Sequence, residues 1–201
     1  CAPLHNSNIK PDEMKVIRAG YKEMFELCGQ TRAGFLHTAD PRDTFEVSEK
    51  ERYEFWEHLY ASKGFGIWQG NFKDVPTDPK ANKAMSDFVA DKIRGRVDDP
   101  EVAEKLIPKD HGFGTRRVPL ETNYYESYNR ENVELIDINE TPIERITPRG
   151  ILTTDKEFEF DLIIYATGFN AILGSYDRID IVGVNGCRLK ERWREELSTF
   201  L

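Results

Sequence analysis

The sequence predicts a mixed α/β fold, with a helical first half followed by a second half that contains the strands. In the first half, apolar residues recur at spacings of three and four, which places them on one face of a helix. In the second half, short runs alternate between apolar and polar residues, as half-buried strands do. The strongest strand signal is the apolar, β-prone segment from Asp161 to Phe169. We interpret it as a strand buried on both faces, ended at Gly168, where another backbone or a ligand can approach closely.

The first predicted helix begins near Pro11, because proline fits the first helical turn. Asp12 and Glu13 follow it and favour the positive N-terminus of a helix. The apolar face of this helix consists of Met14, Ile17, Tyr21, Met24 and Cys28. Residues 30–47 contain several turn formers and are expected to form a loop.

Three further helices are predicted before residue 110. The first begins at Ser48, which has Glu51 three residues later, as in a capping box. Its apolar stripe consists of Tyr53, Trp56 and Tyr60, with Phe55 and Leu59 beside it. The next helix runs from about Pro79 to Gly95, and its inward face consists of Ala81, Met85, Phe88, Val89 and Ile93. A short helix follows between Asp99 and Pro108.

After residue 112 the pattern changes to that of strands. Residues 133–138 are expected to form one strand, and residues 143–146 and 151–154 an antiparallel hairpin. A turn at residues 155–156 leads into a strand over residues 157–167. The second half is therefore predicted to be a small β-meander that leads into the buried strand.

Composition and charge argue against several classes of function. The net charge of −8 disfavours electrostatic binding of nucleic acid, since phosphates require a basic surface. No segment approaches the roughly 20 apolar residues that a membrane-spanning helix needs. Cys1, Cys28 and Cys187 are too few and too scattered for a disulfide framework or a zinc site, which favours a reducing, cytoplasmic compartment. The four histidines lie far apart, so no metal site is expected.

The glycine-rich run from Gly64 to Gly70 does not fit a nucleotide-binding loop. A phosphate-binding loop lies between a strand and a helix, whereas this run follows a predicted helix and contains Trp68. We therefore interpret it as a flexible loop. No other set of glycines fits a dinucleotide fingerprint, so any such loops would lie outside these residues.

The candidate site is the segment from Gly112 to Leu120, in which Arg116 and Arg117 follow two glycines. Arginine keeps its charge where water is scarce, and its planar guanidinium can hold a phosphate or a developing oxyanion. The alternative interpretation is a surface pair, or an arginine bound to a carboxylate on a helix.

Residues 108–138 resemble the pattern P-x-x-[YF]-P-F-G-[TC]-K-R…YY…[FY]-N-R-x-N-V-x-L-[VI]-D of the Baeyer–Villiger monooxygenases, which are flavoproteins with two dinucleotide-binding domains. Residues 166–169, Ala-Thr-Gly-Phe, match the ATG(F/Y) motif of these flavoproteins. An aromatic residue and a proline usually precede the Phe-Gly pair of the pattern, and here His111 and Gly112 stand in their place. Further matches lie at residues 99–106, 141–150, 161–169, 179–183 and 189–193.

The resemblance implies roles for several residues. Arg117 would lie over the flavin of FAD and stabilise the anionic peroxyflavin. Arg116, where the family usually has lysine, would contact the 2′-phosphate of NADPH. The remaining implied contacts are the backbone of Thr167 and Gly168 against the cofactors, and the side chains of Val118 and Leu120 at the substrate pocket.

The resemblance also implies how the chain is organised. Residues 1–110 would form a helical insertion of the NADP domain, residues 111–169 the remainder of that domain with the β-meander and a parallel strand, and residues 170–201 the start of the return into the FAD domain. The fold would be incomplete, because neither phosphate loop is present. The chain starts at Cys1 without a methionine and ends on an apolar residue, which favours an internal fragment of a longer protein.

The implied function is that of part of an FAD- and NADPH-dependent monooxygenase. Such an enzyme inserts one oxygen atom from O₂ beside the carbonyl of a ketone, which gives an ester or a lactone. The remainder of the polypeptide would be needed to complete the flavin site, so these 201 residues are expected to be inactive alone. Two alternatives are a flavoprotein monooxygenase that oxidises nitrogen or sulfur, and a non-catalytic helical interaction module without a cofactor.

Overall fold

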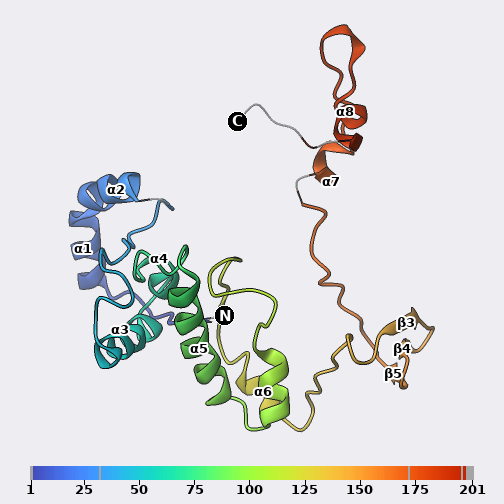
Figure 1. The fold of residues 1–201 in the computed structure, drawn as a ribbon, viewed down its shortest axis with the longest axis horizontal. Helices are drawn as coiled ribbons and strands as arrows, with labels where there is room; N and C mark the ends of the chain where they lie inside the picture. The colour runs from blue at the N-terminus through green and yellow to red at the C-terminus, as the bar shows by residue number, and fades with distance from the viewer. Residues whose placement is uncertain (1, 32, 172, 196, 198–201) are drawn as a thin grey trace. The chain divides into compact units, whose positions relative to one another are not determined.

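The structure is a computed structural model that describes residues 2–31, 33–171, 173–195 and 197. It contains two compact units, Cys1–Asp137 and Ile138–Leu201 (Figure 1). The first unit is mainly helical, and the second contains a three-stranded sheet. The predicted mixed α/β class is therefore confirmed. Cys28 and Cys187 are free thiols, whereas the expectation for Cys1 lies outside the described residues.

The first unit consists of helices joined by loops and two short strands. Its helices are α1 (Pro11–Ala19), α2 (Tyr21–Gln30), α3 (Glu49–Ala61), α4 (Gly66–Gln69), α5 (Pro79–Arg94), α6 (Pro100–Leu106) and the 3₁₀ helix η1 (Glu126–Asn129). The strands β1 (Ala2–Pro3) and β2 (Leu120–Glu121) pair in parallel, with Ala2 opposite Leu120. The start of the chain therefore lies beside the residues that follow the arginine pair.

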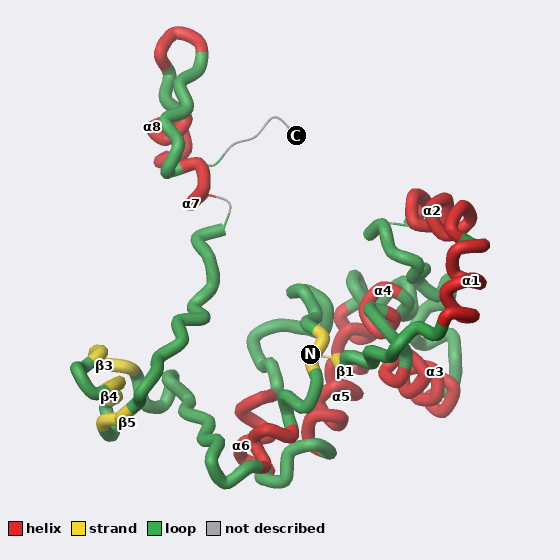
Figure 2. The backbone as a smooth tube through the Cα atoms, turned by 180° about the vertical axis from the view of Figure 1, so that it is seen from behind, coloured by secondary structure: helices red, strands yellow, loops and turns green. Residues whose placement is uncertain are grey.

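Helix α5 organises the core of the first unit and lies between α3–α4 and α6 (Figures 1 and 2). The carboxylate of Asp78 caps its N-terminus by accepting hydrogen bonds from the backbone N–H groups of Lys80 and Ala81. All five residues that the sequence places on its inward face are buried, which confirms that prediction: Ala81, Met85, Phe88, Val89 and Ile93. The helix ends at Gly95 as predicted.

Helix α3 begins as its capping pattern predicts, because the Ser48 hydroxyl accepts a hydrogen bond from the Glu51 backbone N–H at 3.2 Å. Trp56 and Leu59 are buried in the core, whereas Tyr53 of the predicted stripe is exposed. The buried indole N–H of Trp56 donates to the side-chain oxygen of Asn71 at 3.0 Å, so its polar atom has a partner.

Two predictions for the first unit need correction. The segment expected to form one helix with a single apolar face is broken at Gly20 into α1 and α2, and no residue of either helix is buried within the described chain. Glycine weakens a helix and makes a break less costly there. The run from Gly64 to Gly70, expected to be a flexible loop, forms α4, whose Gly66 and Ile67 are buried.

The second unit contains an antiparallel sheet in the order β3–β4–β5. Its elements are β3 (Ile143–Ile146), β4 (Gly150–Thr153), β5 (Glu157–Glu159), α7 (Leu173–Tyr176), the 3₁₀ helix η2 (Val184–Gly186) and α8 (Leu189–Glu195). Ile146 pairs with Ile151 across the predicted turn, which confirms the hairpin and the start of the meander.

One strand that the sequence predicts is not formed, and another is shorter than predicted. Residues 133–138 have no regular secondary structure, and the last strand of the meander stops at Glu159 instead of continuing to Thr167. The segment from Asp161 to Phe169 is loop (Figure 2), and its side chains are exposed apart from the half-buried Ile163, with Leu162 at 74%, Ile164 at 80% and Phe169 at 98%. A strand of this kind needs neighbours on both sides, and none of the described residues pairs with it.

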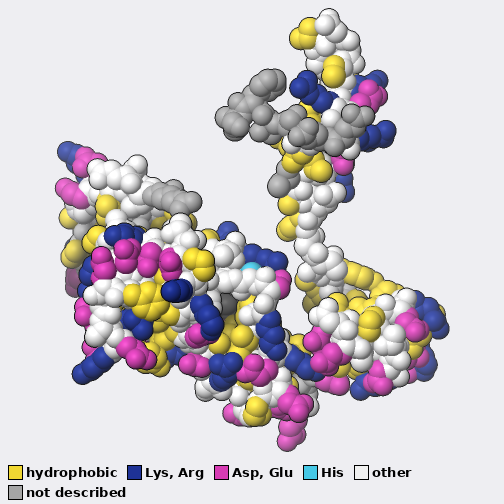
Figure 3. Space-filling model, in the orientation of Figure 1, with side chains coloured by type: hydrophobic (Ala, Val, Ile, Leu, Met, Phe, Trp, Pro, Cys, Tyr) yellow, Lys and Arg dark blue, Asp and Glu magenta, His cyan; other side chains and the backbone are white. Residues whose placement is uncertain are grey.

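The surface of the first unit mixes acidic, basic and apolar side chains on the face drawn in Figure 3. None of the described helices is long and apolar enough to cross a membrane. The domain boundaries at residues 110 and 169 stay predictions, because they refer to cofactor domains.

Candidate active site

The arginine loop, defined as residues Gly112–Pro119, connects the region after α6 to β2 and is attached to α5 at its start. The side-chain amide of Asn82 donates hydrogen bonds to the backbone carbonyls of Phe113 at 2.8 Å and of Val75 at 2.9 Å. One turn further along α5, the Ser86 hydroxyl accepts a hydrogen bond from the Phe113 N–H at 3.0 Å. Two polar side chains of α5 therefore fix the backbone that precedes the arginine pair.

The glycines of the arginine loop allow this close attachment. A Cβ atom at Gly112 would lie 1.9 Å from the side-chain oxygen of Asn82. Gly114 has a φ of +73°, and a Cβ atom there would lie 2.9 Å from the indole nitrogen of Trp68. Both positions thus require glycine, one for space and the other for space and backbone conformation.

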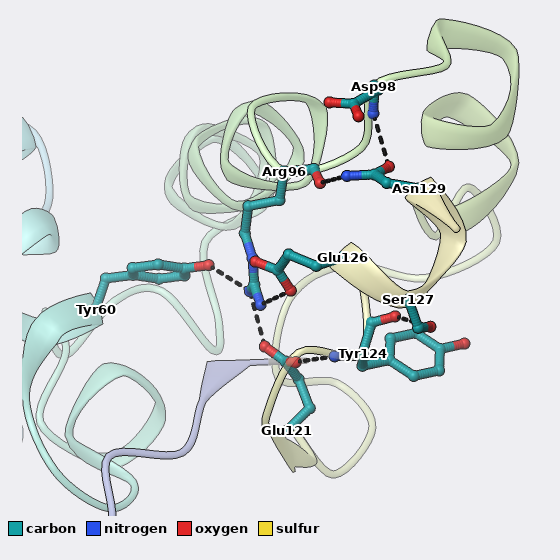
Figure 4. Close-up of polar contacts among 8 residues, drawn as sticks. All are labelled: Tyr60, Arg96, Asp98, Glu121, Tyr124, Glu126, Ser127 and Asn129. Carbon is teal, nitrogen blue, oxygen red and sulfur yellow. Dashed lines mark hydrogen bonds and ion pairs between the residues drawn. The ribbon is translucent and has the colours of Figure 1, made fainter. Parts of the chain in front are cut away.

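An ion-pair network around Arg96 holds the other end of the arginine loop (Figure 4). The Arg96 guanidinium donates to both carboxylate oxygens of Glu126, at 2.6 and 2.8 Å, and to Glu121 of β2 at 2.7 Å. It also donates to the Tyr60 hydroxyl of α3 at 3.2 Å. The second carboxylate oxygen of Glu121 accepts from the Tyr124 N–H at 2.8 Å. The sequence does not reveal this network, because its members come from four separate segments.

The charges in the network shift the pKa values of its members. The hydrogen bonds from Arg96 lower the pKa of Glu126, and the two carboxylates raise the pKa of Arg96 despite its partial burial. Burial raises the pKa of Tyr60. The network therefore pairs the Arg96 cation with carboxylates and links α3, the turn after α5, β2 and η1.

The structure brings Arg116, Arg117 and Val118 to one small cavity of about 90 Å³. Val118 is buried, whereas both arginine side chains are exposed. Leu120 lies in β2, packs against the core and does not line this cavity. The other residues that line the cavity come mainly from α5 and from the segment after α6.

The two arginines have different surroundings. The Arg117 guanidinium lies 5.8 Å from the centre of the Phe65 ring, and it forms no ion pair with any described residue. The Arg116 guanidinium forms an ion pair with Asp110 at 3.1 Å. The carboxylate of Asp110 also accepts a hydrogen bond from Nδ1 of His111 at 2.7 Å. Arg117 is thus available to an anion, and Arg116 already holds one.

Phe65 and His37 support Arg117, and the sequence did not indicate either of them. The Phe65 backbone N–H donates to Nε2 of His37 at 3.2 Å, which places Phe65 at the start of α4. Burial lowers the pKa of His37, which favours the neutral ring that this hydrogen bond requires. The Phe65 ring also contacts Trp68, with ring centres 6.0 Å apart, and Trp68 lies against Gly114. The available signal was the run Gly64–Gly70, which we interpreted as a loop.

Thr167 and Gly168 belong to the second unit, where both are exposed. Gly168 has a φ of +87°, and no atom lies within 4 Å of the position that its Cβ would occupy. This conformation favours glycine and leaves the backbone open to a ligand. Within the described residues, no group of three or more His, Cys, Asp or Glu side chains could hold a metal ion.

Comparison with known proteins identifies relatives along the whole chain. The chain is 52% identical over 201 residues to 2-oxo-Δ3-4,5,5-trimethylcyclopentenylacetyl-CoA monooxygenase of Pseudomonas putida, with 100% of this chain and 37% of that protein covered. It is 42% identical over 163 residues to a Baeyer–Villiger monooxygenase of Pseudooceanicola batsensis, with 81% of this chain and 29% of that protein covered. A search of protein-family models found no match.

A solved structure agrees with these relatives. The crystal structure of OTEMO in complex with FAD and NADP is similar with a TM-score of 0.96 and 52% sequence identity, over 100% of this chain and 38% of that one. The chain thus spans a little over a third of the length of the relatives it matches. The resemblance that the arginine loop and the Ala-Thr-Gly-Phe motif indicated is confirmed, and the chain belongs to the Baeyer–Villiger monooxygenase family.

Proposed function

We propose that this chain is part of an FAD- and NADPH-dependent monooxygenase that inserts one oxygen atom from O₂ beside a ketone carbonyl. The observation that carries the proposal is Arg117, which stands without an ionic partner among the described residues on a loop fixed at both ends. The similarity of the whole of this chain to part of a monooxygenase whose name contains a 2-oxo compound supports the same chemistry.

The residues of the arginine loop fit anionic cofactors. FAD and NADPH carry phosphates, and guanidinium groups bind phosphate with two parallel hydrogen bonds. Both guanidinium groups are exposed at one cavity, while Asn82 and Ser86 fix the backbone beneath them. When bound, FAD would supply the chemistry that activates O₂, and NADPH would supply the reducing equivalents.

Arg117 is suited to hold negative charge that develops on the bound cofactor. A guanidinium group is a permanent cation in proteins, so an arginine here stabilises an anion without acting as a proton donor. The neighbouring Phe65 ring attracts the cation through its π face and leaves the charge available. We assign Arg116 to the 2′-phosphate of NADPH, Val118 and Leu120 to the substrate pocket, and the backbone of Thr167 and Gly168 to the cofactors.

The proposed partners are a ketone and O₂, and the remainder of the polypeptide would complete the flavin site. We also infer a reducing, cytoplasmic location, which the free thiols of Cys28 and Cys187 support.

Replacement of Arg117 tests the proposal in the protein at its full natural length. We expect Arg117→Ala to lower ester or lactone formation by about 100-fold or more, the loss typical when one stabiliser of a developing charge is removed. Arg117→Lys keeps a positive charge without the planar fork, and we expect it to recover part of the rate. Product formation and NADPH consumption should be measured together, with Arg94→Ala, an exposed arginine on α5, as the matched control.

Ketone oxidation that is unchanged in Arg117→Ala would exclude the assigned role. Parallel assays with an amine and a sulfide test the heteroatom alternative: a protein that oxidises these compounds and leaves ketones untouched contradicts ketone oxygenation. A protein that consumes no NADPH and takes up no flavin would instead be the non-catalytic module.

A further inference from the structure

Asp110 forms an ion pair with Arg116, whose guanidinium the proposed function assigns to a phosphate. One carboxylate oxygen of Asp110 lies 3.1 Å from Nη2 of Arg116, and the other lies 2.7 Å from Nδ1 of His111. The hydrogen bond from His111 and the charge of Arg116 lower the pKa of Asp110. Asp110 is therefore a carboxylate, and it is an anion bound where a second anion is expected.

We propose that Asp110 competes with the 2′-phosphate for Arg116 and so sets how strongly the protein prefers NADPH over NADH. This inference rests on the proposed role of Arg116 as the phosphate-binding residue. A carboxylate and a phosphate compete for the N–H donors of a guanidinium, because both bind it through anionic oxygens. A dinucleotide without the 2′-phosphate does not meet this competition.

The Asp110–Arg116 ion pair is weak enough to exchange. The side chains of Asp110 and Arg116 are 67% and 66% exposed, and exposed pairs contribute little to stability. A phosphate that displaces Asp110 from Arg116 still lies close to the negative charge of the Asp110 carboxylate. The expected result is a modest penalty on the phosphorylated cofactor, without a penalty on its unphosphorylated counterpart.

Charged groups of both signs lie beside this site, and one of them, Lys83, forms an ion pair with Asp87 at 2.7 Å. A wider cavity of about 560 Å³ beside the arginine loop is lined by Lys83 and Lys109 together with His111. The acidic residue on its wall, Asp78, is engaged in capping α5. Among the described residues, Asp110 is the acidic side chain that directly contacts Arg116.

Replacement of Asp110 tests the inference in the protein at its full natural length. Asp110→Asn removes the charge and keeps the size of the side chain. We expect the Kd of adenosine 2′,5′-bisphosphate to fall by about threefold to tenfold and that of 5′-AMP to stay unchanged, because an exposed charge at contact distance has an effect of about this size. The ratio of kcat/KM for NADPH to that for NADH should rise by the same factor.

Two controls separate charge at this position from charge in general. Asp91→Asn removes an exposed carboxylate from a similar pair, Asp91–Arg94 at 2.8 Å on α5, and should leave the ratio unchanged. Asp110→Glu keeps the negative charge and should keep the ratio close to that of the natural protein.

Arg116→Ala distinguishes failure of this inference from failure of the proposed function. If Arg116→Ala abolishes the preference for NADPH and Asp110→Asn leaves the NADPH-to-NADH ratio unchanged, as Asp91→Asn should, then Asp110 does not compete with the phosphate. The role of Arg116 stands in that case. If Arg116→Ala leaves the preference intact, the assignment of the phosphate to Arg116 is wrong, and the role of Asp110 falls with it.

Discussion

Replacement of Arg96 by methionine should destabilise the first unit strongly, although Arg96 is an ordinary arginine in the sequence. Methionine keeps the apolar stem of the side chain and removes the guanidinium that binds Glu121, Glu126 and Tyr60. Glu121 should account for most of the loss of stability, because its carboxylate stays in the protein interior without its cation.

The exposed fractions set the expected size of the effect. The Glu121 side chain is only 8% exposed and that of Arg96 is 19% exposed, whereas that of Glu126 is 42% exposed. Loss of one partner from a buried ion pair costs about 3 to 5 kcal/mol, and loss of an exposed pair costs about 0 to 1 kcal/mol. The contact with Glu121 should therefore dominate, and we expect the free energy of unfolding to fall by about 3 kcal/mol.

Urea unfolding of the variants measures this change, provided that the slope of the transition stays constant. Arg94→Met is the matched control, because Arg94 also binds two carboxylates, Asp91 and Glu104, but at the surface. The double variant Arg96→Met with Glu121→Gln removes the unpaired charge and should recover about half of the loss. An equal cost for Arg96→Met and Arg94→Met, or no recovery in the double variant, would refute the reasoning.

Three further predictions follow from the site. Gly114→Ala should cost about 2 kcal/mol, because alanine is strained at a φ of +73° and its Cβ would meet Trp68; a similar loss for Gly29→Ala, where space is open, would contradict this. The pKa of His37 is lowered in the folded state, so its contribution to stability is present above pH of about 6.5 and is lost as the pH falls below that value. His37→Gln should flatten the fall of the melting temperature between about pH 7 and pH 5, and an unchanged slope would exclude His37 as its source. The 201 residues expressed alone should bind FAD poorly, and stoichiometric flavin absorbance in the purified chain would contradict that expectation.

The sequence by itself determined features that depend on near neighbours in the chain. Ser48 caps the helix that follows it, since a cap needs only the next two or three backbone N–H groups. The inward face of α5 follows from helical periodicity, and the β3–β4 hairpin follows from alternation around a turn. The ordered matches along the chain, including the pattern of residues 108–138 and the Ala-Thr-Gly-Phe motif, also indicated the family.

The tertiary structure decided the features that depend on distant neighbours. Arg96 gains its partners from three other segments, and Asn82 and Ser86 of α5 hold a loop about thirty residues away, which no local pattern encodes. The segment from Asp161 to Phe169 has the composition of a central strand, yet it stays a loop here, because a strand exists only with the neighbours that accept its hydrogen bonds. The residue types of the site could therefore be read from the sequence, whereas their partners, including the contact of Asp110 with Arg116, required the folded chain.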